Sequence, residues 1–146
     1  YNYEGVIMKI LIINGPNLNL LGQREVSIYG SETFEDYLEY LRGKFKDINI
    51  SYFQSNVEGE IVTQIQKDSS KDGIIINAGA YTHTSIAIAD AISAIKAPVI
   101  EVHISNILAR EEFRHKSFLS PVCQGSLFGF GIKGYELALY NLVNLL

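Results

Sequence analysis

Five short runs of apolar, largely β-branched residues recur along the chain and constrain its fold more than any other feature of the sequence. The runs cover residues 10–13, 48–53, 73–76, 99–102 and, more weakly, 125–130. Nearly continuous apolar runs of this length are typical of strands that are buried on both faces of a parallel sheet. The sequence therefore predicts a parallel sheet at the centre of the fold.

Helical periodicity separates these runs. The clearest helical pattern follows Thr33, which has capping-box spacing to Asp36; the apolar positions are Phe34, Tyr37, Leu38, Leu41 and Phe45. Weaker helical patterns occupy residues 61–65, 86–95, 106–113 and 135–146. Strands that alternate with helices predict an open, doubly wound α/β sheet of five parallel strands with right-handed crossovers. We expect the flavodoxin-like strand order 2-1-3-4-5.

Length and the position of the only methionine predict one domain. A chain of 146 residues with 47% hydrophobic residues is long enough for one core. Because Met8 is the only methionine, we expect a single domain over residues 8–146 and regard residues 1–7 as added or upstream residues.

The charge balance and the single cysteine exclude several classes of protein. Twelve basic and sixteen acidic residues give a net charge of −4, so we expect neither a nucleic-acid partner nor an anionic membrane surface. One cysteine, with no Cys/His grouping of zinc spacing, predicts no disulfide framework and no structural metal, and favours a cytoplasmic protein. No apolar run approaches the ~20 residues of a membrane span, and the N-terminus has no leader pattern.

Polar residues follow three of the predicted strands. Asn17 belongs to an unusually long connection after the first strand, His83 follows the third strand, and the fourth strand leads into Ser105. Ligands of doubly wound sheets bind beyond the carboxyl ends of the strands, where the winding reverses. We therefore expect the functional site at this edge.

Glu101 and His103 alternate on the fourth strand, so their side chains are expected on one face. A carboxylate beside an imidazole fixes the tautomer and favours the protonated ring, which suits a general acid. A purely structural hydrogen bond explains the pair equally well, but its place at a strand end favours a function.

Arg24 and Tyr29 share the long first connection, where Tyr29 is either an aromatic anchor or a base. Ionising a tyrosine at pH 7 costs about 4 kcal/mol relative to its reference pKa. One guanidinium at ~4 Å, with an effective dielectric constant of ~20, supplies about that much. A base formed by the two residues is therefore physically credible.

Arg110 and Arg114 lie four residues apart, one turn of the predicted helix, with Glu111 and Glu112 between them. Intrahelical ion pairs on a solvent-facing helix would explain this pattern. Because the segment follows the fourth strand directly, one arginine could instead bind an anionic substrate at the strand-end site.

Three other features are interpreted as structural. Residues 129–134 read GFGIKG and match a dinucleotide-binding fingerprint, but no further strand or acidic residue follows at the required distance, so the glycines are predicted to form a tight turn. Cys123 is interpreted as a small buried or loop residue, and His115 as a solvated surface histidine without an orienting partner.

Several long segments together resemble the type II 3-dehydroquinate dehydratases. They read, in family order, NGPNLNLLGQREVSIYG, FQSNVEGEI, NAGAYTHTSIAIADA, IEVHISN and AREEFRHKS, and the resemblance covers nearly all of residues 8–146. It implies a flavodoxin-like subunit in a homododecamer. It also implies loss of water from 3-dehydroquinate to give 3-dehydroshikimate, by anti elimination through an enolate, without cofactor, metal or Schiff base.

The resemblance also implies roles for individual residues. Tyr29 matches the proton acceptor, Arg24 the residue that stabilises its phenolate, and Asn17 the residue that stabilises the enolate. His103 matches the proton donor, oriented by Glu101. The implied substrate contacts are Ser105 and the Ile104 backbone for the carboxylate, and Asn77, His83 and Arg114 for the hydroxyls.

Asp90 matches a residue that reaches the site from a neighbouring subunit, and Arg110 matches a loop arginine that helps to close the site. Val26 departs from the family pattern, in which a proline is common at this position. Because valine lacks the fixed φ of proline, we expect the first connection to be more mobile when no ligand is bound. The remaining alternatives are a flavodoxin-like cofactor-binding oxidoreductase and a non-catalytic binding protein.

Overall fold

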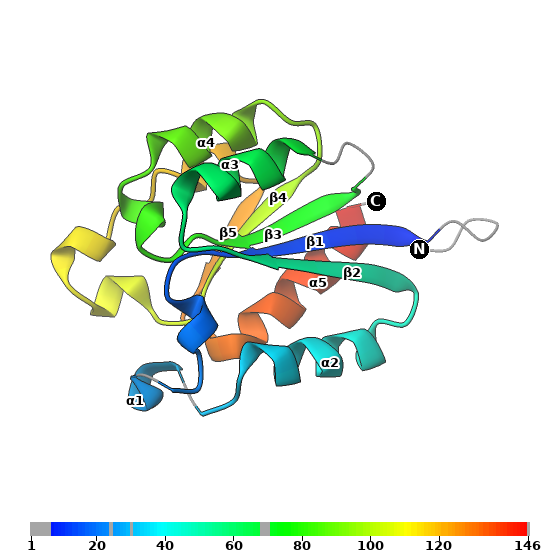
Figure 1. The fold of residues 1–146 in the computed structure, drawn as a ribbon, viewed down its shortest axis with the longest axis horizontal. Helices are drawn as coiled ribbons and strands as arrows, with labels where there is room; N and C mark the ends of the chain where they lie inside the picture. The colour runs from blue at the N-terminus through cyan, green and yellow to red at the C-terminus, as the bar shows by residue number, and fades with distance from the viewer. Residues whose placement is uncertain (1–6, 24, 30, 68–70, 146) are drawn as a thin grey trace.

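The computed structural model describes residues 7–23, 25–29, 31–67 and 71–145, which form a five-stranded parallel sheet between two layers of helices (Figure 1). The strands are β1 (Met8–Asn14), β2 (Ile48–Gln54), β3 (Gly73–Asn77), β4 (Val99–His103) and β5 (Gly125–Phe128). Their order is β2-β1-β3-β4-β5, and every neighbouring pair is parallel. The predicted fold class and strand order are confirmed.

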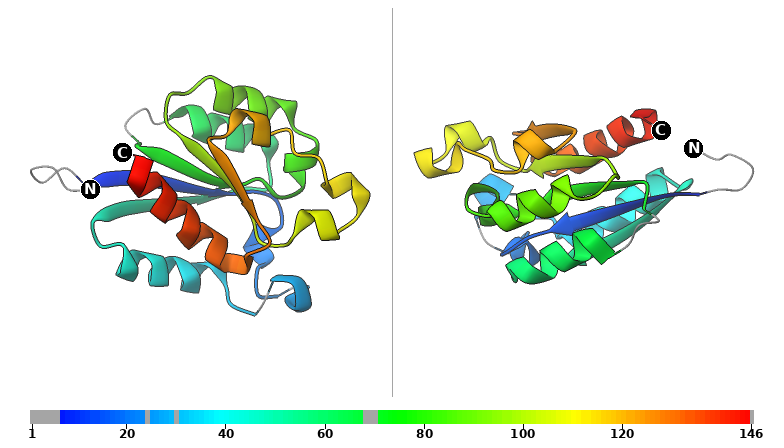
Figure 2. Two further views of the ribbon diagram at one scale, coloured as in Figure 1. Left: turned by 180° about the vertical axis from the view of Figure 1, so that it is seen from behind. Right: turned by 90° about the horizontal axis from the view of Figure 1, so that it is seen from above.

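Each face of the sheet packs against its own pair of helices (Figure 2). Helices α2 (Phe34–Lys44) and α5 (Gly134–Leu145) cover the face to which Ile10 and Ile12 point. Helices α3 (Glu58–Lys67) and α4 (Ile86–Ser93) cover the opposite face, which receives Leu11 and Ile13. This double burial explains why the strands read as apolar runs without alternation.

Local capping agrees with the sequence at α2. The Thr33 hydroxyl accepts a hydrogen bond from the Asp36 backbone N–H at 3.2 Å, as the capping-box spacing predicts. The Ser85 hydroxyl caps α4 in the same way, through Ile88 N–H at 2.9 Å. No helix among the described residues is long and apolar enough to cross a membrane.

The predicted helix over residues 106–113 is wrong. Two short 3₁₀ turns, η3 (Ile107–Ala109) and η4 (Glu112–Arg114), take its place. The backbone of Arg110 between them is extended, with φ −104° and ψ −169°, so the helical hydrogen bonds cannot continue. Arg110 and Arg114 are therefore not one helical turn apart.

The first connection contains more regular structure than a plain loop. It holds the 3₁₀ turn η1 (Leu18–Leu20) and the short helix α1 (Val26–Tyr29). The fifth strand ends at Phe128, before the predicted residue 130, because Gly129 and Gly131 adopt positive φ values of 92° and 62° and turn the chain. The next glycine of this motif, Gly134, packs against Val102, which confirms the tight-turn interpretation.

Candidate active site

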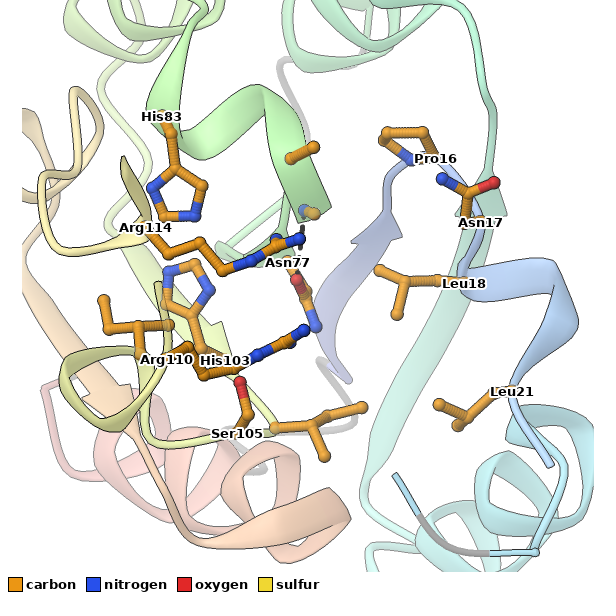
Figure 3. A pocket seen from close by; sticks show the side chains of 14 residues that line it. Pro16, Asn17, Leu18, Leu21, Asn77, His83, His103, Ser105, Arg110 and Arg114 are labelled. Carbon is orange, nitrogen blue, oxygen red and sulfur yellow. Dashed lines mark hydrogen bonds between the residues drawn. The ribbon is translucent and has the colours of Figure 1, made fainter. Parts of the chain in front are cut away.

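A pocket lies beyond the carboxyl ends of β1, β3 and β4 and gathers most of the predicted site residues (Figure 3). The predicted residues that line it are Asn17, Asn77, His83, His103, Ile104, Ser105, Arg110 and Arg114. Pro16, Leu18, Leu21, Gly79, Ala80 and Ile107 complete the lining and were not predicted, because apolar and small residues carry no distinctive chemical signal in a sequence. A pocket therefore lies at the edge of the sheet where the sequence predicts the functional site.

Two predicted residues that the structure describes do not line this pocket, and two more cannot be placed relative to it. Glu101 is 1% exposed and lies behind His103, and Asp90 is exposed on α4. Arg24 and the side chain of Tyr29 lie outside the described residues. The proposed base therefore remains a prediction from the sequence.

Glu101 and His103 form a short, buried polar contact. The His103 imidazole Nε2 lies 2.6 Å from Glu101 Oε2, and the two side chains are 6% and 1% exposed. Because a carboxylate accepts, Nε2 carries the hydrogen of this bond. Nδ1 is then the nitrogen from which a protonated ring can donate to a molecule in the pocket.

Two serine hydroxyls complete the bonding of Glu101. Ser117 donates to Oε2 at 2.6 Å and Ser126 donates to Oε1 at 2.7 Å. Burial alone would raise the pKa of Glu101, but the bonds and charge of His103, together with both hydroxyls, lower it to about 2. The Glu101 carboxylate is thus ionised at neutral pH, and no motif in the sequence indicated either serine.

His83 faces His103 in the pocket. The two imidazole rings are nearly parallel, with an interplanar angle of 23° and centroids 6.3 Å apart. His83 Nδ1 lies 2.8 Å from the Lys116 carbonyl oxygen, so Nδ1 donates and a neutral ring presents Nε2 as an acceptor. Burial lowers the pKa of His83, with further lowering by the neighbouring His103 and Arg114.

Arg110 and Arg114 are held by the carboxylate between them. Glu111 Oε1 lies 3.6 Å from Arg110 Nε and 3.0 Å from Arg114 Nε. Figure 3 shows that both side chains extend into the pocket beside His103 and Asn77. Both arginines can therefore pair with Glu111 and still present their guanidinium groups to an anion in the pocket.

A buried hydrogen-bond chain fixes the ends of β1 and β3. The Tyr135 hydroxyl donates to Asn14 Oδ1 at 2.7 Å and accepts from Asn77 Nδ2 at 3.0 Å. Asn77 Oδ1 accepts from the Gly79 backbone N–H at 3.1 Å. Helix α5 thereby positions the Asn77 side chain at the pocket floor, and sequence spacing could not indicate a contact across the whole chain.

Gly15 lets the turn after β1 approach the turn after β3. A side chain there would place Cβ 2.5 Å from the Ala78 carbonyl oxygen, and the backbone could not shift enough to remove this clash. The same close approach lets Gly15 N–H donate to the Asn77 carbonyl at 2.7 Å. The two strand ends that build the pocket are thus joined directly.

Cys123 and His115 do not line the pocket. Burial and the charge of Glu101 raise the pKa of the Cys123 thiol to about 12, which keeps it protonated and confirms its structural interpretation. His115 is exposed as predicted, but its Nε2 lies 2.9 Å from the Arg110 carbonyl oxygen. The expectation that His115 lacks an orienting partner is wrong, because the two 3₁₀ turns bring it back onto Arg110.

Taken together, the pocket offers an oriented imidazole that can donate a proton, a second imidazole that can accept a hydrogen bond, and two guanidinium groups. These groups fit a small anionic molecule that bears hydroxyls and loses one of them. Such a reaction also needs a base, which the sequence predicts on the first connection.

Comparison with known proteins points to one family. The sequence profile of the family described as "Dehydroquinase class II" matches residues 8–143. A 3-dehydroquinate dehydratase from Caldicellulosiruptor saccharolyticus is 58% identical over 142 residues, which cover 94% of this chain and 98% of the relative.

Solved structures agree with that comparison. The type II dehydroquinase from Butyrivibrio crossotus superposes with a TM-score of 0.91 at 49% identity and covers 94% of this chain and 98% of its own. The type II dehydroquinase from Propionibacterium acnes gives a TM-score of 0.88 at 43% identity and covers 95% and 99%.

Proposed function

This chain belongs to the class II dehydroquinase family, and from that membership we infer that it removes water from 3-dehydroquinate to give 3-dehydroshikimate. It is accordingly a hydro-lyase, and the reaction is a step of the shikimate pathway toward chorismate and the aromatic amino acids. The observation that carries the assignment is the Glu101–His103 pair at 2.6 Å in a pocket that also holds two arginines. Nothing in the comparisons favours a flavodoxin-like oxidoreductase.

His103 supplies the acid of the elimination in this proposal. The reaction breaks the bond between a ring carbon and its hydroxyl, and the leaving oxygen must gain a proton to depart as water. Because Nε2 is engaged by Glu101, the proton passes from Nδ1 of the imidazolium. Glu101 stays ionised throughout, so it stabilises the imidazolium without taking its proton.

Tyr29 is proposed to take the other proton. The hydrogen on the carbon beside the ketone passes to the Tyr29 phenolate, and the electron pair of that bond forms the enolate. Arg24 is proposed to hold the phenolate in its ionised form, and Asn17, which lines the pocket, to stabilise the enolate oxygen. The two proton transfers leave Tyr29 protonated and His103 neutral, and exchange with solvent restores both.

The remaining pocket residues bind the substrate in this proposal. Ser105 and the Ile104 backbone contact the carboxylate, and Asn77, His83 and Arg114 contact the hydroxyls. His83 suits a hydroxyl because its neutral ring presents Nε2 as an acceptor. Arg110 closes the site from the segment between η3 and η4.

The oligomeric and cellular setting forms part of the same proposal. We propose a single catalytic domain over residues 8–146 that assembles into a homododecamer in the cytoplasm, with Asp90 completing the site of a neighbouring subunit. Exposure of Asp90 on α4, outside the pocket of its own chain, supports a role between subunits.

A direct assay tests the proposed reaction. The product is a conjugated enone, so adding 3-dehydroquinate to the purified protein should produce an increase in ultraviolet absorbance. Activity that persists after dialysis against a chelator and after borohydride treatment with substrate would support a mechanism without metal or imine. A folded protein that leaves 3-dehydroquinate unchanged, or one that carries bound flavin, would contradict the assignment.

A further inference from the structure

The segment that begins with Arg114, the last residue of η4, contacts the site through three of its residues. Arg114 lines the pocket, the Lys116 carbonyl accepts from His83 Nδ1 at 2.8 Å, and the Ser117 hydroxyl donates to Glu101 at 2.6 Å. Residues 114–117 thus supply one guanidinium group to the pocket, a hydrogen bond to His83 and a hydrogen bond to the Glu101 carboxylate. The reaction scheme above uses the first two contacts and leaves Ser117 without a role.

The hydrogen bonds of Ser117 determine where its proton points. Its oxygen accepts the backbone N–H groups of Leu119 at 3.1 Å and Ser120 at 3.0 Å. With both lone pairs engaged, the single hydroxyl hydrogen is directed to Glu101 Oε2. This oxygen is the one that also accepts from His103 Nε2.

We propose that Ser117 is a positioning residue that fixes the Glu101 carboxylate in its ionised form and in the orientation that aims His103 at the leaving hydroxyl. The proposal rests on the dehydration reaction inferred above and adds a residue to it. The Ser117 hydroxyl and His103 Nε2 meet on one oxygen, so rotation of the carboxylate would break both bonds together.

The segment has anchors that do not depend on the Ser117 hydroxyl. Phe118 N–H donates to the Thr82 carbonyl at 2.9 Å, and the Leu119 side chain is fully buried against the α3 and α4 core. Removing one hydroxyl should therefore leave the course of the chain intact. An effect on catalysis would then report on the acid pair itself.

The titratable groups that face Glu101 are few among the described residues. His103 lies on the same strand, His83 lies on the 3₁₀ turn η2 (Gly79–His83), and Cys123 precedes β5. Burial keeps the Cys123 thiol protonated, and it lowers the pKa of His83. Loss of the Ser117 donor should therefore appear as a higher pKa of Glu101.

The test compares Ser117→Ala with Ser117→Thr and with Ser120→Ala. Ser120→Ala is the matched control, because it removes an exposed hydroxyl of the same segment that bonds to the Ser126 hydroxyl at 2.6 Å and reaches Glu101 only through Ser126. We expect Ser117→Ala to lower kcat by roughly 10-fold to 100-fold, as loss of one hydrogen bond to a charged group does, with KM within about threefold. Ser117→Thr should restore most of kcat, and Ser120→Ala should stay within about twofold of the parent.

The pH profile separates positioning from a structural effect. In Ser117→Ala, kcat relative to the parent should fall further as the pH drops from 7 to 4.5, because Glu101 becomes easier to protonate. Equal kcat values in all three variants, or a loss in Ser117→Ala with an unchanged pH profile and no rescue by threonine, would overturn the proposal. Circular dichroism at each pH verifies that the variants are folded.

A spectroscopic measurement tests the role of Ser117 without relying on dehydratase activity. The ¹³C shift of the Glu101 carboxyl, followed between pH 2 and 6, should titrate at higher pH in Ser117→Ala than in Ser120→Ala. An unshifted titration would contradict the proposal even in an active enzyme. Absence of dehydratase activity in the unmodified protein would instead refute the proposed function.

Discussion

His83 and His103 lie nearly parallel in the pocket, with ring centroids 6.3 Å apart, yet their hydrogen bonds prepare them for opposite tasks. His103 donates Nε2–H to an ionised carboxylate, which fixes the orientation of its ring. His83 donates Nδ1–H to a neutral carbonyl, and burial lowers its pKa. One imidazole is thereby prepared to give a proton and the other to accept a hydrogen bond.

Tyr29→Phe should abolish turnover while substrate still binds. Phenylalanine keeps the ring and removes the group proposed to take the proton, so kcat should fall by more than about 100-fold. Equilibrium binding of 3-dehydroquinate, measured by calorimetry, should stay within about threefold, because the carboxylate and hydroxyl contacts lie on other residues. Tyr140→Phe, at a tyrosine that is 45% exposed on α5, is the control. Substantial kcat in Tyr29→Phe would show that another group is the base.

Glu101 should contribute to stability in a pH-dependent way. Its pKa is lowered from 4.5 to about 2 in the folded protein, so its contribution is complete above pH ~4.5 and disappears as the pH falls through about 2. The free energy of unfolding of the parent should therefore exceed that of Glu101→Gln by up to ~3 kcal/mol more at pH 6 than at pH 2. Urea unfolding across this range measures the difference. A constant difference would mean that the carboxylate is not preferentially ionised in the fold.

The strand-end location of the site could be predicted from the sequence, because parallel strands place their carboxyl ends at one edge. The Glu101–His103 contact could be predicted too, since residues two apart on a strand share a face. Both inferences depend only on local geometry and on one rule of topology. Neither inference requires contacts between residues that are far apart in the sequence.

The surroundings of that pair could not be predicted in the same way. Ser117, Ser126 and Tyr135 reach the site from distant segments, and serines and tyrosines of this kind occur throughout the chain. The arginine segment was assigned to a helix because its spacing is helical, yet the extended backbone of Arg110 divides it into two 3₁₀ turns. Local contacts of Arg110 with Glu111 and His115 accompany this extended backbone, and residue spacing alone does not reveal them.

Tyr135→Phe should destabilise the fold and loosen the pocket floor. The substitution leaves Asn14 Oδ1 and Asn77 Nδ2 without their shared partner in a fully buried position. Unpaired buried polar groups cost about 1–3 kcal/mol, which should appear as a lower urea midpoint. KM should rise as well, because Asn77 is a proposed substrate contact. Unchanged stability in Tyr135→Phe, with Tyr140→Phe as control, would mean that the two asparagines find other partners.

Asp90 should act on the site of a neighbouring subunit. It lies four residues after Ile86 on α4, and both side chains face away from the core, with Ile86 60% exposed. A large apolar residue beside an acidic one on an uncovered face is typical of an interface between subunits. Asp90→Asn should therefore reduce kcat/KM by about tenfold or more without changing the assembly mass.

Mixing the two impaired proteins tests whether the site is shared. When Asp90→Asn and Tyr29→Phe subunits are dissociated, mixed equally and reassembled, about a quarter of the sites should combine an intact Tyr29 with an intact Asp90 from the neighbour. Activity should therefore recover well above the mean of the two parents. The recovery should require reassembly, because subunits that are mixed without dissociation keep their original neighbours. If Asp90 acted within its own chain, every site would carry one defect and the activity of the mixture would not exceed the mean of the two parents.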